Sequence, residues 1–137
     1  MFYGTMEGEQ LFLPAIITRF DDEERRKLYT RVLKSIVNGK FTGRKVNGRP
    51  AVRLPTRSKT TRDTRVTIYA NHVMLVMHGK LPRADEQASH LCHNRACIDV
   101  EHLVWESPGN NARRKHCVQH GKCVCKLQPP CLMKCLP

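Results

Sequence analysis

The cysteine residues of this chain are confined to its C-terminal third. All seven lie in the last 46 of 137 residues, between Cys92 and Cys135; four histidines are interspersed among them and a fifth, His90, lies just before Cys92. An odd number of cysteines, in a chain without the basic start of a secretory signal, argues against a disulfide framework. Cysteine mixed with histidine is instead typical of zinc coordination. We therefore expect zinc to hold the C-terminal third together.

The spacing of the first ligands predicts a compact zinc-tied turn. Cys92, Cys97 and His102 follow one another at intervals of five residues, so they can converge on one tetrahedral zinc if the chain turns back between them. Strand-like residues follow His102, and Pro108 then introduces a break after which Asn111 can begin a helix. The predicted order is strand, zinc-tied turn, strand, helix.

Positive charge dominates all but the first 24 residues. The chain has 24 Lys and Arg against 12 Asp and Glu, a formal charge of +12, and six of the acids lie in residues 1–24 beside a single base. The other 113 residues therefore carry 23 bases and 6 acids, or +17. A charge of this size favours a nucleic acid as partner over an inert basic surface. No apolar run approaches the roughly 20 residues of a membrane span, so we expect no membrane association.

Residues 40–66 combine turn signals with a dense run of bases. Glycine and proline divide the segment into short pieces, and Asn47-Gly48 predicts a two-residue hairpin. Arginines spaced by four residues would share one side of an extended chain. A basic two-stranded ribbon of this kind fits the DNA major groove better than it fits the role of a merely solvated sheet face. The residues expected to contact DNA are Arg44, Lys45, Arg49, Arg53, Arg57, Lys59 and Arg62.

Apolar periodicity predicts two packing helices. The first begins at the acidic residues 21–24, which supply a cap and a favourable first turn, and it runs through Val37 until Asn38-Gly39 ends it. The second follows a short strand within residues 66–79 and is closed by Gly79. We expect no chemical role for the first helix, and on the second only His72 is kept as a reserve ligand.

The residues with chemical potential form an ordered series in the C-terminal half. The series is Ser89-His90-Leu91-Cys92-His93-Asn94, Cys97, His102-Leu103, Trp105-Glu106-Ser107, Asn111 and Arg114, followed by the cysteine-rich tail. In order and spacing it resembles the His-Cys box homing endonucleases, which are intron-encoded members of the ββα-metal (His-Me finger, HNH-like) nuclease superfamily. The resemblance covers about residues 66–131. It implies a small α+β, zinc-stapled nuclease that cleaves double-stranded DNA, with a homodimer as the expected assembly.

The resemblance implies roles for three residues. His90 takes the place of the general base that deprotonates the attacking water, and Asn111 that of the only protein ligand to a catalytic Mg²⁺. Asn110 is the alternative to Asn111, but only Asn111 has the family's distance from His90, so Asn110 is expected to cap the helix. Arg65 best matches the family's arginine for the cleaved phosphate, with Arg57 as second choice.

The resemblance also implies two structural zinc ions. The expected ligands of the first are Cys92, Cys97 and His102. The family takes its fourth ligand from an upstream cysteine that this chain lacks, which leaves His72, Cys135 or water as alternatives. The expected ligands of the second are Cys117, Cys123, Cys125 and Cys131. Cys125 stands where the family has histidine, and Cys135 is an alternative to Cys131.

We therefore predict a single domain, 1–137, in four parts. These are an N-terminal helical region (1–39), a basic β segment (40–66), a ββα-metal module with the first zinc site (67–116) and a tail with the second (117–137). The predicted function is a Mg²⁺-dependent, site-specific homing endonuclease acting inside the cell, in the nucleus. A non-catalytic zinc-containing DNA-binding protein is one alternative. An RNA-binding zinc protein is another, although the scarcity of aromatic residues in the basic stretch counts against it.

Overall fold

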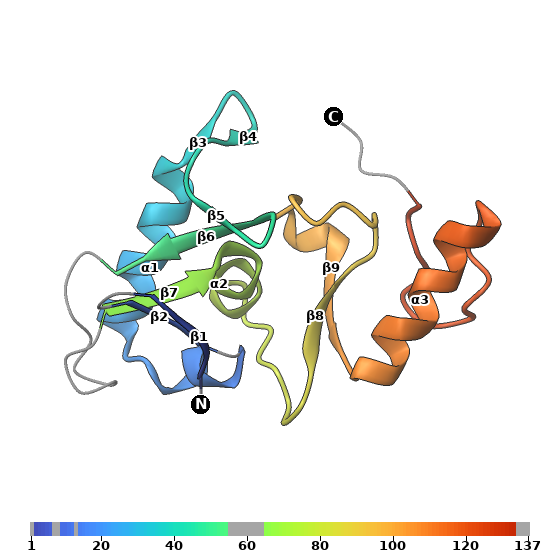
Figure 1. Ribbon diagram of the computed structural model, residues 1–137, viewed down its shortest axis with the longest axis horizontal. Helices are drawn as coiled ribbons and strands as arrows, with labels where there is room; N and C mark the ends of the chain where they lie inside the picture. Colours follow the sequence, from blue (N-terminus) through green and yellow to red (C-terminus); the bar gives the residue numbers. More distant parts are fainter. Residues whose placement is uncertain (1, 7–8, 13, 55–64, 134–137) are drawn as a thin grey trace.

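The chain folds into two parts that lie side by side, a sheet covered by helices and a hairpin with one helix (Figure 1). The computed structural model describes residues 2–6, 9–12, 14–54 and 65–133, and its side chains within 17–54 and 66–133. The architecture is α+β, as predicted. None of the helices in these ranges is long and apolar enough to cross a membrane.

The larger sheet has five strands in the order β1-β2-β7-β6-β5. Their bounds are β1 (Phe2–Met6), β2 (Glu9–Phe12), β5 (Lys45–Val46), β6 (Arg49–Arg53) and β7 (Arg65–Tyr69). Neighbouring strands are antiparallel except β2 and β7, which are parallel. Asn47 and Gly48 connect β5 to β6 with φ of 54° and 75°, which confirms the predicted hairpin turn.

Helix α1 (Asp22–Lys34) begins where the acidic run predicts. The Asp21 carboxylate accepts a hydrogen bond from the Glu24 amide at 2.8 Å, which caps the helix. The predicted end of the helix was wrong, because α1 stops at Lys34 and the next residues form β3 (Ile36–Val37), paired with β4 (Lys40–Phe41). Asn38-Gly39, with φ of 52° and 77°, is the turn of this second hairpin. Two consecutive left-handed residues match the twist of antiparallel strands, and they outweigh the helical spacing of the residues before them.

The main apolar core lies between the helices and the larger sheet. Helix α2 (Ala70–Met77) follows directly from β7, as predicted, and packs against α1 and β6 (Figure 1). The 3₁₀ helix η1 (Pro14–Arg19) also contributes to this core. The most deeply buried members are Ile17, Leu28, Val32, Val66, Ile68, Ala70 and Val73.

The C-terminal part has the predicted order of strand, turn, strand and helix. Its elements are β8 (Gln87–His90), η2 (Val100–His102), β9 (Leu103–Glu106) and α3 (Pro108–His120). Strands β8 and β9 are antiparallel, with His90 opposite Leu103. The expectation that Asn110 caps α3 was wrong: the Ser107 hydroxyl accepts a hydrogen bond from the Asn110 amide at 3.1 Å, and Pro108 takes the first helical position, where no amide hydrogen is needed.

Replacing Leu28 with alanine should weaken the main core. The Leu28 side chain is fully buried, so the cavity left by Leu28→Ala is expected to lower the free energy of unfolding by about 2–5 kcal/mol. Urea unfolding of the zinc-loaded protein, followed by circular dichroism, measures the change. The control is Leu33→Ala on the same helix, where the side chain is 47% exposed and the loss should stay within about 0.5 kcal/mol. Equal losses from the two variants would contradict the packing described here.

Candidate active site and zinc centres

The first predicted ligand group is assembled in the turn between β8 and β9. The ligand atoms of Cys92, Cys97 and His102 all lie within 4.8 Å of one another, and Cys97 Sγ is 3.3 Å from His102 Nδ1. Sulfur and nitrogen bound tetrahedrally to one zinc stand about 3.5 Å apart. Asp99 lies behind the imidazole, with Oδ2 3.9 Å from His102 Nε2, where a carboxylate can orient a metal-bound histidine. The three side chains therefore fit a structural zinc ion.

Of the alternatives for a fourth ligand to this zinc, His72 is not brought to the group. Its ring lies instead between Tyr69 and Trp105, with centroid distances of 5.5 and 5.3 Å. Burial first, and then the charges of Arg49 and His90, lower the pKa of His72 to about 3, so the ring is a neutral packing residue. Cys135 lies outside the described residues.

The second ligand group is assembled after α3, from four cysteines. The sulfur atoms of Cys117, Cys123, Cys125 and Cys131 all lie within 4.8 Å of one another. Cys125 Sγ is 3.8 Å from Cys123 Sγ and 3.9 Å from Cys131 Sγ, close to the spacing of about 3.8 Å expected of sulfurs around one zinc. The replacement of the family's histidine by Cys125 leaves the tetrad intact.

His90 ends strand β8, and the charge of Arg49, on β6 of the larger sheet, acts on its ring. Burial first, and then the positive charge of Arg49, lower its pKa to about 4, so the ring is neutral near pH 7. One ring nitrogen bonds to the backbone of Cys97, whereas Nε2 is buried and has no hydrogen-bond partner among the described residues. The zinc-tied turn thus holds one nitrogen of the ring and leaves the other able to accept a proton.

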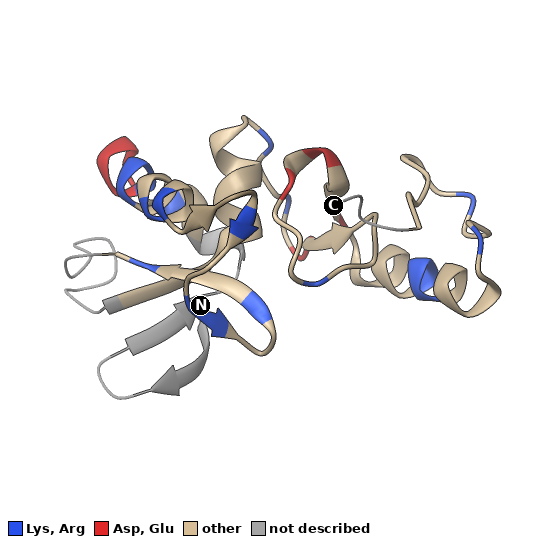
Figure 2. Cartoon of the chain, turned by 90° about the horizontal axis from the view of Figure 1, so that it is seen from above, with Lys and Arg blue, Asp and Glu red and all other residues tan. Residues whose placement is uncertain are grey.

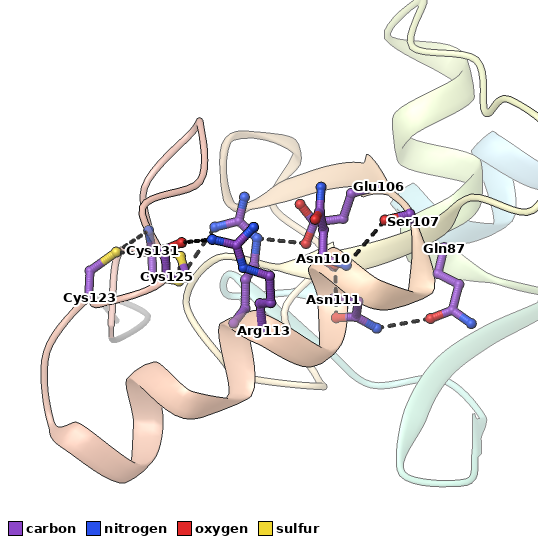
Figure 3. Close-up of polar contacts among 11 residues, drawn as sticks. Gln87, Glu106, Ser107, Asn110, Asn111, Arg113, Cys123, Cys125 and Cys131 are labelled. Carbon is purple, nitrogen blue, oxygen red and sulfur yellow. Dashed lines mark hydrogen bonds and ion pairs between the residues drawn. The ribbon is translucent and has the colours of Figure 1, made fainter.

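Asn111 lies at the front of α3, against the same strand. Its Oδ1 accepts a hydrogen bond from Ser89 Oγ at 2.9 Å, and its Nδ2 donates to Gln87 Oε1 at 3.0 Å (Figure 3). These two bonds fix which way the amide faces. The oxygen has a second lone pair, so an oriented amide oxygen remains able to bind a hard cation.

Strand β8 therefore fixes the place of both predicted catalytic side chains. Ser89 binds Asn111, and the next residue is His90. His90 is the last residue of β8, and its Nε2 has no hydrogen-bond partner, Asn111 included, among the described residues. A substrate phosphate would have to bridge the two groups.

Arg49 occupies a place that the sequence did not reveal. Its guanidinium carbon lies 5.6 Å from the centre of the Tyr69 ring, and its Nε is buried without a hydrogen-bond partner among the described residues. Its charge acts on both His72 and His90. This arginine lies half-buried beside the general-base candidate, with a donor still to be satisfied.

The remaining predicted DNA contacts are less closely tied to the site. Arg44 and Lys45 are exposed and Arg53 is half-buried, on or beside the β5–β6 hairpin. Figure 2 marks the Lys and Arg positions of the described chain in blue. Arg57, Lys59 and Arg62 lie outside the described residues. Arg65 begins β7, whereas Tyr69, next to Arg49, ends that strand. Four residues of strand, about 13 Å, therefore separate Arg65 from the end of β7 that borders the site.

The sequence did not reveal the roles of four supporting residues, of which Ser89, Glu106 and Arg114 belong to the series that carries the resemblance and Gln87 does not. Gln87 and Ser89 orient Asn111, and a buried ion pair joins Arg114 Nε to Glu106 Oε2 at 2.6 Å. The signal for the strand pair was the alternation of Gln87 and Ser89, which puts both on one face of β8. The ion pair gave no comparable signal, because an arginine on a polar helix is ordinarily solvated.

The fold and the two ligand groups define the class of this protein: an α+β, zinc-stapled protein with the ββα-metal arrangement of His-Me finger nucleases. Residues 38–136 match the family model described as the zinc-binding loop region of homing endonuclease, and the chain belongs to that family. A search of curated proteins and a search of solved structures gave no match. Membership confirms the resemblance seen in the sequence and indicates an endonuclease with DNA as its substrate.

The purified protein should contain two tightly bound zinc ions per chain, one for each ligand group. Elemental analysis by mass spectrometry measures the number. Cys125→Ser combined with Cys131→Ser should reduce it to one, because two ligands do not hold a structural zinc. His116→Ala, at an exposed histidine beside Cys117, is the matched control and should keep both ions. A metal-free wild-type protein would contradict the assignment of both sites.

Proposed function

We propose that this protein is a Mg²⁺-dependent homing endonuclease that hydrolyses phosphodiester bonds at specific sites in double-stranded DNA. One observation carries the proposal. His90 Nε2 is neutral and has no partner among the described residues, the charge of Arg49 acts on this ring, and the strand of His90 also orients Asn111. These are the three functions that phosphodiester hydrolysis needs, a proton acceptor, a cation for the phosphate and an oxygen ligand for a metal.

His90 is the proposed general base. Its bond to the Cys97 backbone fixes the ring, so Nε2 is the nitrogen that takes the proton from an attacking water. A neutral ring is required for this step, and both burial and the nearby Arg49 charge favour that form. Cys92, two residues along the chain, would hold the first zinc together with Cys97 and His102, and that zinc would keep the backbone of the base in place.

Arg49 is the proposed phosphate ligand, in preference to Arg65 and Arg57. A guanidinium binds phosphate oxygens through paired N–H donors, and the Arg49 Nε–H lacks another partner among the described residues. Packing over the Tyr69 ring limits the positions that the guanidinium can take. An arginine constrained in this way would hold the scissile phosphate next to His90.

Asn111 is the proposed protein ligand of Mg²⁺. Its amide oxygen is turned toward Ser89 and is not engaged by Gln87, so the donor chemistry fits a hard cation that keeps most of its water. When bound, the metal would neutralise charge on the phosphate and stabilise the leaving 3′ oxygen. The chain's own contribution is to hold that oxygen ligand still.

The proposal extends to how the DNA is held and where it is cut. The exposed basic residues of the β5–β6 hairpin, Arg44 and Lys45, would contact the DNA duplex. A two-fold homodimer would cut both strands of a near-palindromic site. The genomic DNA of the nucleus is the proposed substrate, in the setting of intron homing. The ends released from a randomised duplex library, when sequenced, would report the site and its symmetry.

Replacing the base should separate cutting from binding. His90→Ala is expected to lower the cleavage rate with Mg²⁺ by about 10²–10⁴-fold, because a general base typically contributes that much. Binding of the selected duplex, measured by fluorescence anisotropy in EDTA, should stay near wild type. His78→Ala, at an exposed histidine on the far end of α2, serves as the control and should cut normally. If the wild-type protein and His90→Ala both bind the duplex and neither cuts it, the protein is a non-catalytic DNA-binding protein.

Replacing the proposed phosphate ligand, Arg49, should slow cleavage more than removing an equal positive charge elsewhere on the hairpin. Arg49→Gln is expected to reduce the single-turnover rate by about 10²-fold, since it removes the proposed cationic ligand of the phosphate, whose charge also acts on the base. Arg44→Gln changes the net charge equally on the exposed side of the hairpin and should mainly weaken binding. Single-turnover kinetics at saturating protein separate the two effects. Equal rates for the two variants would rule out the special role of Arg49.

A further inference from the structure

Helix α3 has almost no apolar anchor to the rest of the protein. Of its 13 residues, the two that are buried are Arg114 and Cys117, an arginine and a zinc ligand. A helix with such a polar surface depends on specific tertiary contacts for its position. The contacts of Arg114 therefore bear directly on where Asn111, on the same helix, is placed.

Arg114 joins three elements through one buried guanidinium. The side chain is 1% exposed, its Nε donates to Glu106 Oε2 of β9 at 2.6 Å, and its Nη1 donates to Cys131 Sγ at 3.4 Å. Asn111 precedes Arg114 by three residues and so lies on the same side of α3. When Glu106 and Cys131 hold Arg114, they also set the rotation of the helix that presents the Asn111 amide to β8.

The zinc cluster and the arginine stabilise each other electrostatically. Cys131 is buried, and Arg114 Nη1 lies 3.4 Å from its sulfur, where a guanidinium stabilises a thiolate. Four thiolates around one Zn²⁺ carry a formal charge of 2 − 4 = −2, and a buried arginine that donates to one of those sulfurs offsets part of it. The arginine in turn gains a second anionic partner beside Glu106, which lowers the cost of burying its charge.

A second set of hydrogen bonds connects the chain next to Cys131 with the chain next to His90, the proposed base. The amides of Leu132 and Met133, which follow Cys131, donate to the Leu91 carbonyl at 2.8 and 3.4 Å. Leu91 is the residue between His90 and Cys92. Cys131 is thus linked through Arg114 to the helix of Asn111, and through its own backbone to the turn of His90.

We propose that the second zinc site positions the catalytic side chains, with Arg114 as the positioning residue that transmits its effect to Asn111. The inference rests on the proposed function for its catalytic meaning, but the mechanical coupling is a property of the folded chain alone. Zinc at the four cysteines then acts on the reaction from outside the active site. It holds in register the helix and the hairpin that must face each other across the substrate.

The direct test observes Asn111 without any DNA. Its side-chain amide gives a resolved NMR signal, because Nδ2 is bonded to Gln87. Arg114→Lys keeps the charge but loses the fork that spans Glu106 and Cys131, so this signal should move toward that of a free amide. The same shift is expected in the variant with Cys125→Ser and Cys131→Ser. Lys115→Arg, a charge-conserving change at the exposed neighbour, should leave the signal in place.

A kinetic cycle tests the consequence for the reaction. Arg114→Lys should lower the single-turnover rate about tenfold or more, with zinc content and DNA affinity near wild type, since small displacements of a positioned group are costly. In an Asn111→Ala background the same substitution should cost almost nothing further, because the two act as one unit. Additive losses, or an unmoved Asn111 signal, would overturn the inference. A shifted signal in a protein whose wild type does not cut would leave the coupling standing and refute the proposed function instead.

Discussion

The structure of the C-terminal part depends on the attraction between a dication and cysteine thiolates. The apolar core is built mainly from residues 17–76, whereas the cluster that follows α3 has Cys117, Cys125 and Cys131 as its buried members. Without a metal, these buried thiols repel one another as soon as they ionise. A structural zinc contributes an apparent binding free energy of about 10–16 kcal/mol, as large as the net stability of a whole domain, which is about 5–15 kcal/mol. Around α3 and the tail, metal coordination therefore takes the place of an apolar core, whereas the β8–β9 hairpin packs on α2 through Leu75, Ala88 and Leu103.

The same constraint explains how a small hairpin can hold the proposed general base in a fixed orientation. His90 and Cys97 are joined by a hydrogen bond, and Cys97 belongs to the first ligand group. A base on a free loop would lose its orientation to thermal motion, whereas here the turn that contains its partner is pinned by three ligands. Zinc is thus used for rigidity near the site, and the proposed chemistry falls to oxygen and nitrogen groups.

What could be predicted from sequence was what depends on local spacing. The intervals of the ligands, the acidic start of α1 and the Asn47-Gly48 turn each act within a few residues, and the structure confirms the turn and the helix start. The predicted end of α1 was wrong because the pairing of β3 with β4 competes with helical periodicity. The surroundings of Arg49 could not be predicted from nearby residues, since they are formed by Tyr69, His72 and His90, which belong to three other elements. The ion pair of Arg114 with Glu106 likewise becomes visible only when α3 is packed on β9.

Ligand chemistry also keeps the two kinds of metal apart under the proposed function. Both zinc groups consist of soft sulfur with at most one imidazole, which Mg²⁺ binds poorly. The proposed Mg²⁺ ligand is instead a neutral amide oxygen, and the side chains bonded to it, Ser89 and Gln87, are also uncharged. A single neutral oxygen attracts a hard dication only weakly, so most of the binding must come from the phosphate oxygens of the substrate. The metal and the DNA would then assemble together, and the hydrolytic site would be complete only when the correct duplex lies between His90 and Asn111.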